Sequence, residues 1–415
     1  MLRADQKRYL KLEPLSKVFD AIRKEVKPLG TELVPTEDAL DRICAKNYRA
    51  RWDVPPFDVS AMDGYAFRYS DLFTSRIFLV KRKIFPSTKV RRKIKKGEAC
   101  YVATGSPLPL GADTVARVEQ TRVLKESKIE ITRIEKAKNV SRKGEDIKKG
   151  EIILQSGKRI NPASLSLLVY YGIRRVRVYK KPKTGVLSIG DELCEFKQKQ
   201  KGKLYNNYAY LVLNYLKRLG FDVMNFGVCQ DQNRKIAKIV AQALKSVDVL
   251  FTIGGTSVGL KDQTPDALSS LSSRFLFHGV RVVPIKPAGV AKLNQKYVVL
   301  LPAHPVSLVL SFHVVAIPVL SLLSGCEFNS FKCSVSAILE QPIRNERNID
   351  ALYLVTLTRK ERELVAKPLE WGSNLMSNVM RAQGFVLVKA HEELKQADRI
   401  EVELLGAQEL MGVCY

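Results

Sequence analysis

Hydrophobic positions between about residues 181 and 323 alternate between short apolar runs and helical stripes. The runs GVLSI (185–189), FDVMNFGV (221–228), VLFTI (249–253), RVVPI (281–285) and YVVLL (297–301) predict buried strands. Between two of them, the apolar residues of segment 236–244 recur at the i, i+3, i+4, i+7 and i+8 spacing of an amphipathic helix. A second helix is predicted between Asn206 or Asn207 and Gly220. This alternation predicts a mainly parallel sheet covered by helices on both faces.

The flanking segments have other patterns. Residues 1–50 predict two amphipathic helices, one carrying Val18, Phe19, Ile22 and Val26 and the other starting after Thr36. Short strands separated by Gly- and Pro-containing turns fill residues 65–180 and predict small β-rich modules. From Cys333 onward, VSAILE, ALYLVTLT, FVLVKA and RIEVELL predict a small terminal β-domain. The apolar segment 306–323 is interrupted by polar residues and Pro318, which favours a buried helix over a membrane span.

The segment DVLFTIGGTSVGLKD (248–262) predicts a strand that ends in an anion-binding loop. Glycines at a strand end let backbone N–H groups approach an anion closely, and Thr264-Pro265 predicts the start of a helix whose N-terminus adds positive potential. The spacing fits neither a P-loop nor a dinucleotide-binding fingerprint. An ordinary strand-to-helix turn remains the alternative. In parallel sheets, ligands bind beyond the carboxyl ends of the strands, where Asp191-Glu192 and Asp231 are also predicted.

Composition narrows the classes of function. The net charge is +27, and nine of the sixteen residues in segment 81–96 are Lys or Arg. Aromatic residues do not alternate with these basic runs and no nucleic-acid recognition motif is present, so we expect solvated basic faces and a small anionic substrate rather than nucleic acid. Seven dispersed cysteines without a CxxC pair, and an N-terminus without an apolar core, favour reduced thiols in the cytoplasm. Four dispersed histidines argue against a His-ligated metal.

Six further motifs contain residues that folding alone does not require. In chain order, they are PPFDVSAMDGYA (55–66), TGSPLP (104–109), GEDI (144–147), SIGDEL (188–193), GGTSVGLKD (254–262) and LPAHPVS (301–307). Together and in this order they resemble the MoeA family of molybdopterin molybdenumtransferases, which includes the gephyrin E-domain. The resemblance covers essentially the whole chain.

The resemblance implies an α/β multidomain fold with four domains. They are an elongated linker domain (1–50 and 140–180), an inserted β-rich domain (51–139), a molybdopterin-binding α/β domain with a mainly parallel sheet (181–327) and a C-terminal β-barrel-like domain (328–415). It also implies a cytoplasmic homodimer whose cleft lies between the α/β domain of one subunit and the inserted domain of the other. A molybdopterin adenylyltransferase-type protein is a candidate partner, whereas nucleic acid and membrane are not expected.

The implied reaction inserts molybdate into adenylylated molybdopterin and releases AMP, with Mg²⁺ or Zn²⁺ as cofactor. By motif match, the implied catalytic residues are Asp63, Asp146, Asp231 and Asp262, and the implied metal ligands are Asp63, Asp146, Glu192 and Asp231. The implied contacts to pterin, phosphate or oxyanion are Thr104, Glu192, Gly254, Gly255, Ser257, Gly259, Lys286 and Ser373. Each has a structural alternative: Asp63, Thr104 and Asp262 also suit turn or helix capping. We interpret Asp58 as structural.

The chain departs from the family pattern at two of these loops. KPGKP becomes KPAGV (286–290), which lacks the second lysine, and LPGNP becomes LPAHP (301–305). A missing cation weakens oxyanion binding by about 1–3 kcal/mol unless another group replaces it, and Lys261 or Lys292 are candidates for that replacement. Two other functions therefore stay open: a weakened molybdopterin-binding or scaffolding relative, and a molybdopterin adenylyltransferase.

Overall fold

The chain folds into two compact units. The computed structural model describes residues 10–88, 93–125, 127–132, 134–198, 200–256, 263–328 and 332–406. One unit comprises Met1–Leu33 and Arg177–Tyr415, and the other comprises Val34–Val176. The four domain boundaries expected from the sequence stay a prediction.

A six-stranded mixed sheet organises the first unit. Its strands are β13 (Thr184–Ile189), β16 (Val223–Cys229), β17 (Val249–Ile253), β18 (Arg274–His278), β20 (Gly289–Leu293) and β21 (Lys296–Leu301). They lie in the order β16-β13-β17-β21-β20-β18. The first four are mutually parallel, whereas β20 and β18 are antiparallel to their neighbours. The mainly parallel sheet is therefore confirmed, with an antiparallel pair at one edge.

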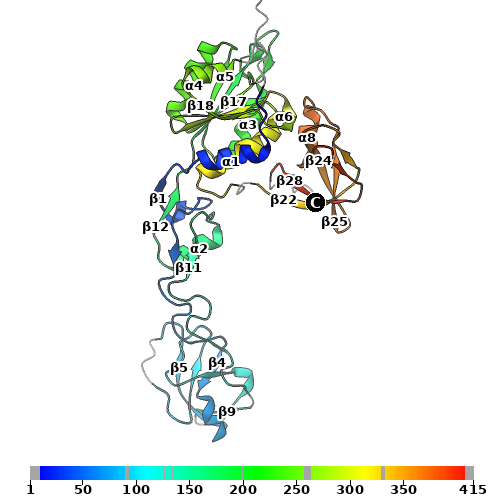
Figure 1. Cartoon of the computed structure of the whole chain (residues 1–415). Coiled ribbons are helices and arrows are strands. Elements are labelled where there is room, and N and C mark those ends of the chain that lie inside the picture. The colour runs from blue at the N-terminus through cyan, green and yellow to red at the C-terminus, as the bar shows by residue number, and fades with distance from the viewer. Residues whose placement is uncertain are drawn as a thin grey trace, which may run out of the picture. The chain divides into compact units, whose positions relative to one another are not determined.

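Helices cover both faces of this sheet (Figure 1). On one face α4 (Asn233–Ser246) and α5 (Thr264–Ser270) pack against alternate strand residues such as Leu187 and Leu250. On the other, α1 (Leu15–Glu25) and α3 (Asn207–Arg218) pack against Val186 and Phe251. The apolar stripe of α4 is buried at Ile236, Val240, Ala243 and Leu244, as its spacing predicts.

The segment Pro305–Leu323 is a core helix with a local irregularity. It runs as α6 (Pro305–Ser311), a π-helical turn (Phe312–Ala316) and α7 (Ile317–Leu323). Pro318 lacks the N–H of a regular helix, and such a defect accompanies π turns. By length and composition the helix could cross a membrane, but 94% of its most apolar window is buried inside the structure. The prediction of a buried helix is confirmed.

The C-terminal part of the first unit is a closed five-stranded barrel. Its strands are β22 (Ser334–Leu339), β24 (Asp350–Lys360), β25 (Glu363–Pro368), β26 (Gly384–Val388) and β28 (Arg399–Leu404), and pairing between β24 and β26 closes it. Three further elements lie between the barrel strands in the chain. They are a short helix, α8 (Met376–Arg381), and the paired strands β23 (Ile343–Arg344) and β27 (Glu393–Leu394). The assignment of RVVPI to the α/β sheet is wrong: β19 (Val282–Val283) pairs with β24 of the barrel instead. An apolar run shows that a strand is buried but not which sheet it joins.

The second unit contains a curled mixed sheet. Its strands are β4 (Gly64–Phe67), β5 (Ile77–Ile84), β6 (Glu98–Val102), β7 (Thr114–Arg117), β8 (Thr121–Val123) and β9 (Lys128–Ile131), in the order β7-β4-β6-β5-β9-β8. Alternation along β4 sends Phe67 to one apolar cluster and Ala66 to another. Both faces of the sheet are thereby used for packing.

Three short two-stranded ladders pair strands from residues 31–60 with strands from residues 140–179. They comprise β2 (Tyr48–Arg49) with β11 (Ile152–Leu154), β3 (Val59–Ser60) with β10 (Val140–Ser141), and β1 (Thr31–Pro35) with β12 (Arg175–Tyr179). A helix, α2 (Pro162–Tyr170), is capped by the Asn161 side chain. The predicted helix after Thr36 is wrong: Thr36–Asp38 forms one 3₁₀ turn, because the Thr36 hydroxyl donates to the Ile173 carbonyl at 2.5 Å and Asp41 adopts a φ of 60°.

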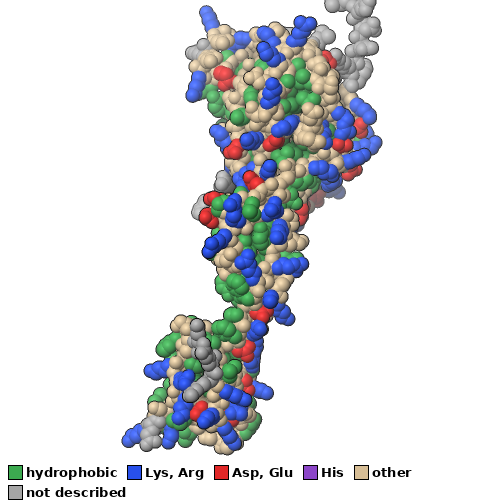
Figure 2. All heavy atoms as spheres, turned by 90° about the vertical axis from the view of Figure 1, so that its left-hand side faces the viewer, with side chains coloured by type: hydrophobic (Ala, Val, Ile, Leu, Met, Phe, Trp, Pro, Cys, Tyr) green, Lys and Arg blue, Asp and Glu red, His purple; other side chains and the backbone are tan. Residues whose placement is uncertain are grey.

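Positive charge is distributed over the surface. Figure 2 shows Lys and Arg side chains spread across the visible face, with Asp and Glu side chains between them. Several are paired, as Lys296 is with Asp248 at 2.6 Å. On this face the arrangement fits solvated basic surfaces, as expected from the sequence.

Candidate functional site

Four loops meet at the carboxyl ends of the parallel strands in the first unit. The loop after β13 is joined to the end of β16 by a hydrogen bond from Gly190 N to Cys229 O of 3.0 Å. The loop after β17 is joined to the end of β21 by a bond from Gly254 N to Leu301 O of 3.1 Å. These bonds follow from the parallel register of neighbouring strands. They place the polar residues that follow each strand in one region, as the sequence predicts.

The paired glycines after β17 are required by close packing. Gly254 has φ +92°, and a Cβ there would lie 2.4 Å from the Ile189 carbonyl oxygen. Gly255 has φ +62°, and a Cβ there would lie 2.7 Å from Thr264 Oγ1 and 3.5 Å from Asp231 Oδ1. The chain thus approaches β13 and Thr264 more closely than a Cβ permits, whereas the contact with Asp231 is an ordinary van der Waals distance. These contacts place Gly254 and Gly255 next to Asp231.

Asp231 and Asp191 hold two of these loops together. The Asp191 N–H donates to Asp231 Oδ2 at 3.2 Å, and the Asp231 N–H donates to Asp191 Oδ1 at 3.3 Å. The Lys203 ammonium also contacts the Asp191 carbonyl. One carboxylate oxygen of each Asp is engaged in this lock. Asp191 was absent from the sequence-predicted site residues, although its position directly before Glu192 could have indicated it.

The other predicted residues of this unit lie on neighbouring loops. Glu192 is exposed next to Asp191, and its carboxylate closely approaches Gly190, where a Cβ would meet Oε1 at 2.8 Å. Lys286 is exposed after β19, and its carbonyl accepts from Val280 N at 2.9 Å. Ser373 reaches the start of α6 because its carbonyl accepts from Val306 N at 3.1 Å. A residue distant in sequence is thereby joined to the LPAHPVS loop.

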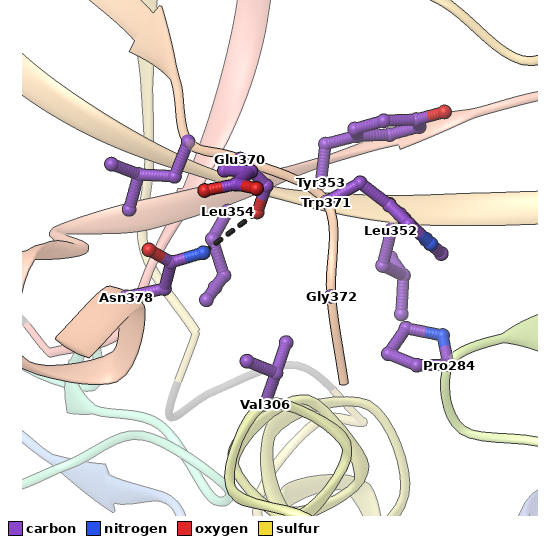
Figure 3. A pocket seen from close by; sticks show the side chains of 10 residues that line it. Pro284, Val306, Leu352, Tyr353, Leu354, Glu370, Trp371, Gly372 and Asn378 are labelled. Atoms are coloured by element: carbon purple, nitrogen blue, oxygen red, sulfur yellow. Dashed lines mark hydrogen bonds between the residues drawn. The ribbon is translucent and has the colours of Figure 1, made fainter. Parts of the chain in front are cut away.

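A small apolar pocket lies where the barrel meets the start of α6 (Figure 3). Pro284, Val306, Leu352 and Trp371 point into it, while Asn378 donates to the Glu370 carbonyl at 2.7 Å at its edge. Its volume of about 10 Å³ holds roughly one water molecule. The pocket is therefore too small for a pterin.

In the second unit, Asp63 and Thr104 form a compact pair. Asp63 Oδ1 accepts from Thr104 N at 2.6 Å and from Thr104 Oγ1 at 2.8 Å. These two bonds lower the pKa of Asp63 and outweigh the opposing desolvation, so the exposed carboxylate is ionised at neutral pH. The bond from Gly105 N to Ser60 O at 2.7 Å holds the two loops in register. The structure thus joins two motifs about 40 residues apart.

Asp58 and Asp146 differ in their environments. Asp58 accepts from Arg142 Nη1 at 2.6 Å and from Lys143 N at 2.9 Å, which matches its interpretation as structural. Asp146 is exposed, and its N–H donates to the Val54 carbonyl at 3.0 Å. Its carboxylate has no bonded partner among the described residues and faces solvent.

The departures from the family pattern have clear structural consequences. Ala303 fits beside Gly254, because its methyl lies 3.7 Å from where a Gly254 Cβ would be. The expectation that Lys292 replaces the missing lysine is wrong: Lys292 Nζ lies 3.8 Å from the Glu25 carboxylate and 5.7 Å from the Tyr297 ring centroid. It is therefore held against α1 by its own ion pair.

Four predicted positions, Ser257, Gly259, Lys261 and Asp262, lie outside the described residues. Sequence reasoning also missed His278. Its Nε2 lies 2.9 Å from the carbonyl oxygen of Thr256, which directly follows the paired glycines. Within the described ranges, no three His, Cys, Asp or Glu side chains gather as a metal site. The cysteines in those ranges are free thiols, namely Cys44, Cys100, Cys194, Cys229, Cys326 and Cys333.

Comparisons with known proteins agree with this arrangement. A family model described as "MoeA N-terminal region (domain I and II)" matches residues 13–172, and one described as "Probable molybdopterin binding domain" matches residues 185–322. A molybdopterin molybdenumtransferase of Haemophilus influenzae is 35% identical over 72% of this chain and 74% of its own length. One from Synechococcus elongatus is 29% identical over 91% of this chain and 95% of its own. A solved molybdopterin biosynthesis MoeA protein of Pyrococcus horikoshii superposes with a TM-score of 0.81 at 28% identity, covering 96% of this chain and all of that one.

Proposed function

Because the chain belongs to the MoeA family of molybdopterin molybdenumtransferases, we propose that it inserts molybdate into adenylylated molybdopterin and releases AMP. It is a transferase of molybdenum cofactor biosynthesis. The observation that carries the proposal is the convergence of Gly254, Gly255, Asp231 and the LPAHP loop at the carboxyl ends of parallel strands. A substrate with a phosphate group and a flat heterocycle suits such an open strand-end site.

Anion binding is assigned to the loops with cations and backbone donors. Lys286 is exposed after β19 and supplies a positive charge. Ser373 adds a hydroxyl close to the start of α6. The glycine loop supplies backbone donors, to which we also assign Ser257 and Gly259 from the sequence.

Carboxylates are assigned to metal handling and proton transfer. Cleavage of a phosphoanhydride needs charge neutralisation and positioning more than a protein nucleophile. Mg²⁺ is typically held by one or two carboxylates together with substrate phosphates, so Asp231 and Glu192 suffice on this unit without a preformed cage. We propose Mg²⁺ as the cofactor, with Zn²⁺ as the alternative.

Asp63, Thr104 and Asp146 belong to the second unit, whereas Asp231 and Glu192 belong to the first. We propose that a homodimer unites the two sets, with the second unit of one subunit completing the site of the other. Sedimentation at micromolar concentration tests this: we expect a dimer, and a fully active monomer would refute it. A cytoplasmic location fits the reduced cysteines expected from the sequence.

The direct test is AMP release from adenylylated molybdopterin with and without molybdate. We expect release that depends on molybdate and on Mg²⁺, with molybdenum recovered on the pterin. Release of pyrophosphate from ATP and molybdopterin would instead indicate the adenylyltransferase reaction. If the protein catalysed neither reaction, the proposal that it is an enzyme would be refuted.

A weakened relative is the second candidate, and the environment of Lys292 favours it. KPAGV lacks one lysine, and the ion pair of Lys292 with Glu25 prevents that side chain from replacing it. Titration of molybdopterin binding separates the two candidates. Binding without AMP release would support the weakened relative, whereas molybdate-dependent release rules it out.

A further inference from the structure

A basic groove lies on the curled sheet of the second unit and has no part in the proposed reaction. Its volume is about 430 Å³, within the range of ligand-binding pockets. Tyr65 of β4, Lys81 and Lys83 of β5, Val123 of β8 and Lys128 of β9 line it. The groove therefore combines positive charge with an apolar side.

Among the described residues, none forms a strand that pairs with β5 along this groove. Its antiparallel partner β9 pairs with it over Ile77–Leu79, and one more bond joins Val80 N to Ser127 O at 2.8 Å. From Lys81 to Ile84, the part of the chain that the structure describes offers β6 as partner on the opposite side. A break in the register between Val80 and Arg82 makes Lys81 a bulge residue. Within the described residues, the backbone of the four residues 81–84 therefore has no strand paired with it on the side opposite β6.

The charges on this edge are not neutralised within the described ranges. Lys81, Arg82 and Lys83 are exposed, and no described Asp or Glu forms an ion pair with them. Lys83 lies opposite Tyr101, whose ring contacts Tyr65 at 5.6 Å between centroids, so both tyrosines share its face of the sheet. The ligand that suits this edge must be anionic.

We propose that this groove binds an extended acidic peptide segment, which adds as a strand to the free edge of β5. Main-chain groups of the peptide pair with the β5 backbone, as in other strand-addition complexes. Carboxylates at alternate peptide positions contact Lys81 and Lys83, and apolar residues between them cover Val123, which is 69% exposed. Because edge strands are prone to unwanted pairing, the lysines also restrict the edge to acidic partners.

Single-stranded nucleic acid fits the same charge less well. Base recognition without sequence preference needs several aromatic faces on which successive bases stack. Among the described residues that line the groove, Tyr65 is the one aromatic side chain, and Tyr101 already contacts its ring edge-to-face. A free backbone edge, by contrast, is a feature that peptides use and nucleic acids do not.

The test measures fluorescence anisotropy of a labelled six-residue peptide of alternating glutamate and valine, titrated with the full-length protein. The groove variant carries Lys81→Gln and Lys83→Gln. The matched control carries Lys95→Gln and Lys96→Gln, which removes the same charge from exposed positions of the same basic run outside the groove. We expect the groove variant to weaken binding about tenfold and the control less than twofold. Equal effects of both variants would overturn the proposal.

Two altered probes test the mode of binding. A peptide with N-methylated backbone at alternate residues cannot form the ladder, and we expect it to bind about tenfold more weakly. Equal binding of that peptide, or tighter binding of an oligothymidylate of equal charge, would overturn strand addition. The groove variant should release AMP at the wild-type rate, because its lysines are not assigned to the substrate. A parallel loss of AMP release would make the groove part of the substrate site and also overturn the proposal.

Discussion

Replacing Gly254 with alanine tests whether the glycine loop is held by backbone contact. The new Cβ would lie 2.4 Å from the Ile189 carbonyl oxygen, so strand β13 or the loop has to move. Overpacking of this kind costs about 1–3 kcal/mol. The positive φ of +92° adds about 1–2 kcal/mol for a residue with a Cβ. Restriction of the unfolded chain returns about 0.4–1 kcal/mol. The expected loss of unfolding free energy is about 1–5 kcal/mol.

Gly202→Ala is the matched control for this measurement. Gly202 has φ +79°, but no atom lies within 4 Å of its added Cβ. It therefore reports backbone strain alone, for which we expect a net cost of about 1 kcal/mol or less. Both glycines belong to the first unit. The difference between the variants isolates the contact with Ile189.

Tryptophan fluorescence during urea unfolding measures the two variants. The chain has two tryptophans, Trp52 in the second unit and Trp371 in the first, so a Trp52→Phe background reports the first unit selectively. We expect Gly254→Ala to lower the midpoint clearly more than Gly202→Ala, and to lower AMP release by moving the loop. Equal midpoints for the two variants would show that the loop is not held against β13, and would refute the reasoning.

Three further outcomes follow from the site. Asp63→Asn keeps an oxygen acceptor for Thr104 but removes the charge, so AMP release should fall about 100-fold, with at most a small loss of stability. Near-normal turnover would remove Asp63 from the catalytic residues. Lys286→Ala should raise the KM for adenylylated molybdopterin, whereas neutralising Lys95 and Lys96 together should not, and equal KM changes would indicate diffuse charge instead. For Asp58, burial opposes ionisation, but the Lys143 N–H and the Arg142 guanidinium outweigh it and hold its pKa below the usual 3.8. Its stabilisation is present above that pH and lost as pH falls through the lowered pKa. Asp58→Asn should thus be less stable than wild type at pH 7, and the difference should disappear as pH falls through the lowered pKa, as urea midpoints across pH will show.

Local patterns predicted the elements that carry the site. The stripe of α4 and the runs before Gly190 and Gly254 depend on neighbouring residues in sequence, so periodicity reveals them. The same alternation predicted the α/β sheet and the strands of the terminal β-domain, whereas the barrel formed by those strands was implied by the family resemblance.

Features that depend on tertiary contact were not predictable in this way. The lock between Asp191 and Asp231 joins residues 40 apart through backbone N–H groups, which no side-chain pattern reports. RVVPI is apolar enough for either sheet, and its partner is decided by packing. The sequence does not reveal that Lys292 pairs with Glu25 of α1, because the two residues are distant in the chain. The hydrophobic pattern of the sequence identifies helices and strands, whereas the tertiary contacts of the folded chain decide which of them pack together.

The first unit is built from two separate segments of the chain, and this affects how it folds during synthesis. Helix α1 leaves the ribosome early, but Val18, Ile22 and the adjacent Val26 belong to a core whose remaining buried members begin at Val186. Between the two parts lie the 143 residues of Val34–Val176, which form a unit of their own. Because domains fold as the chain emerges, the second unit can complete its core while α1 still waits with its apolar stripe uncovered. Chains that stop near residue 176 should therefore expose that stripe to chaperones, because the buried residues that cover it begin only at Val186.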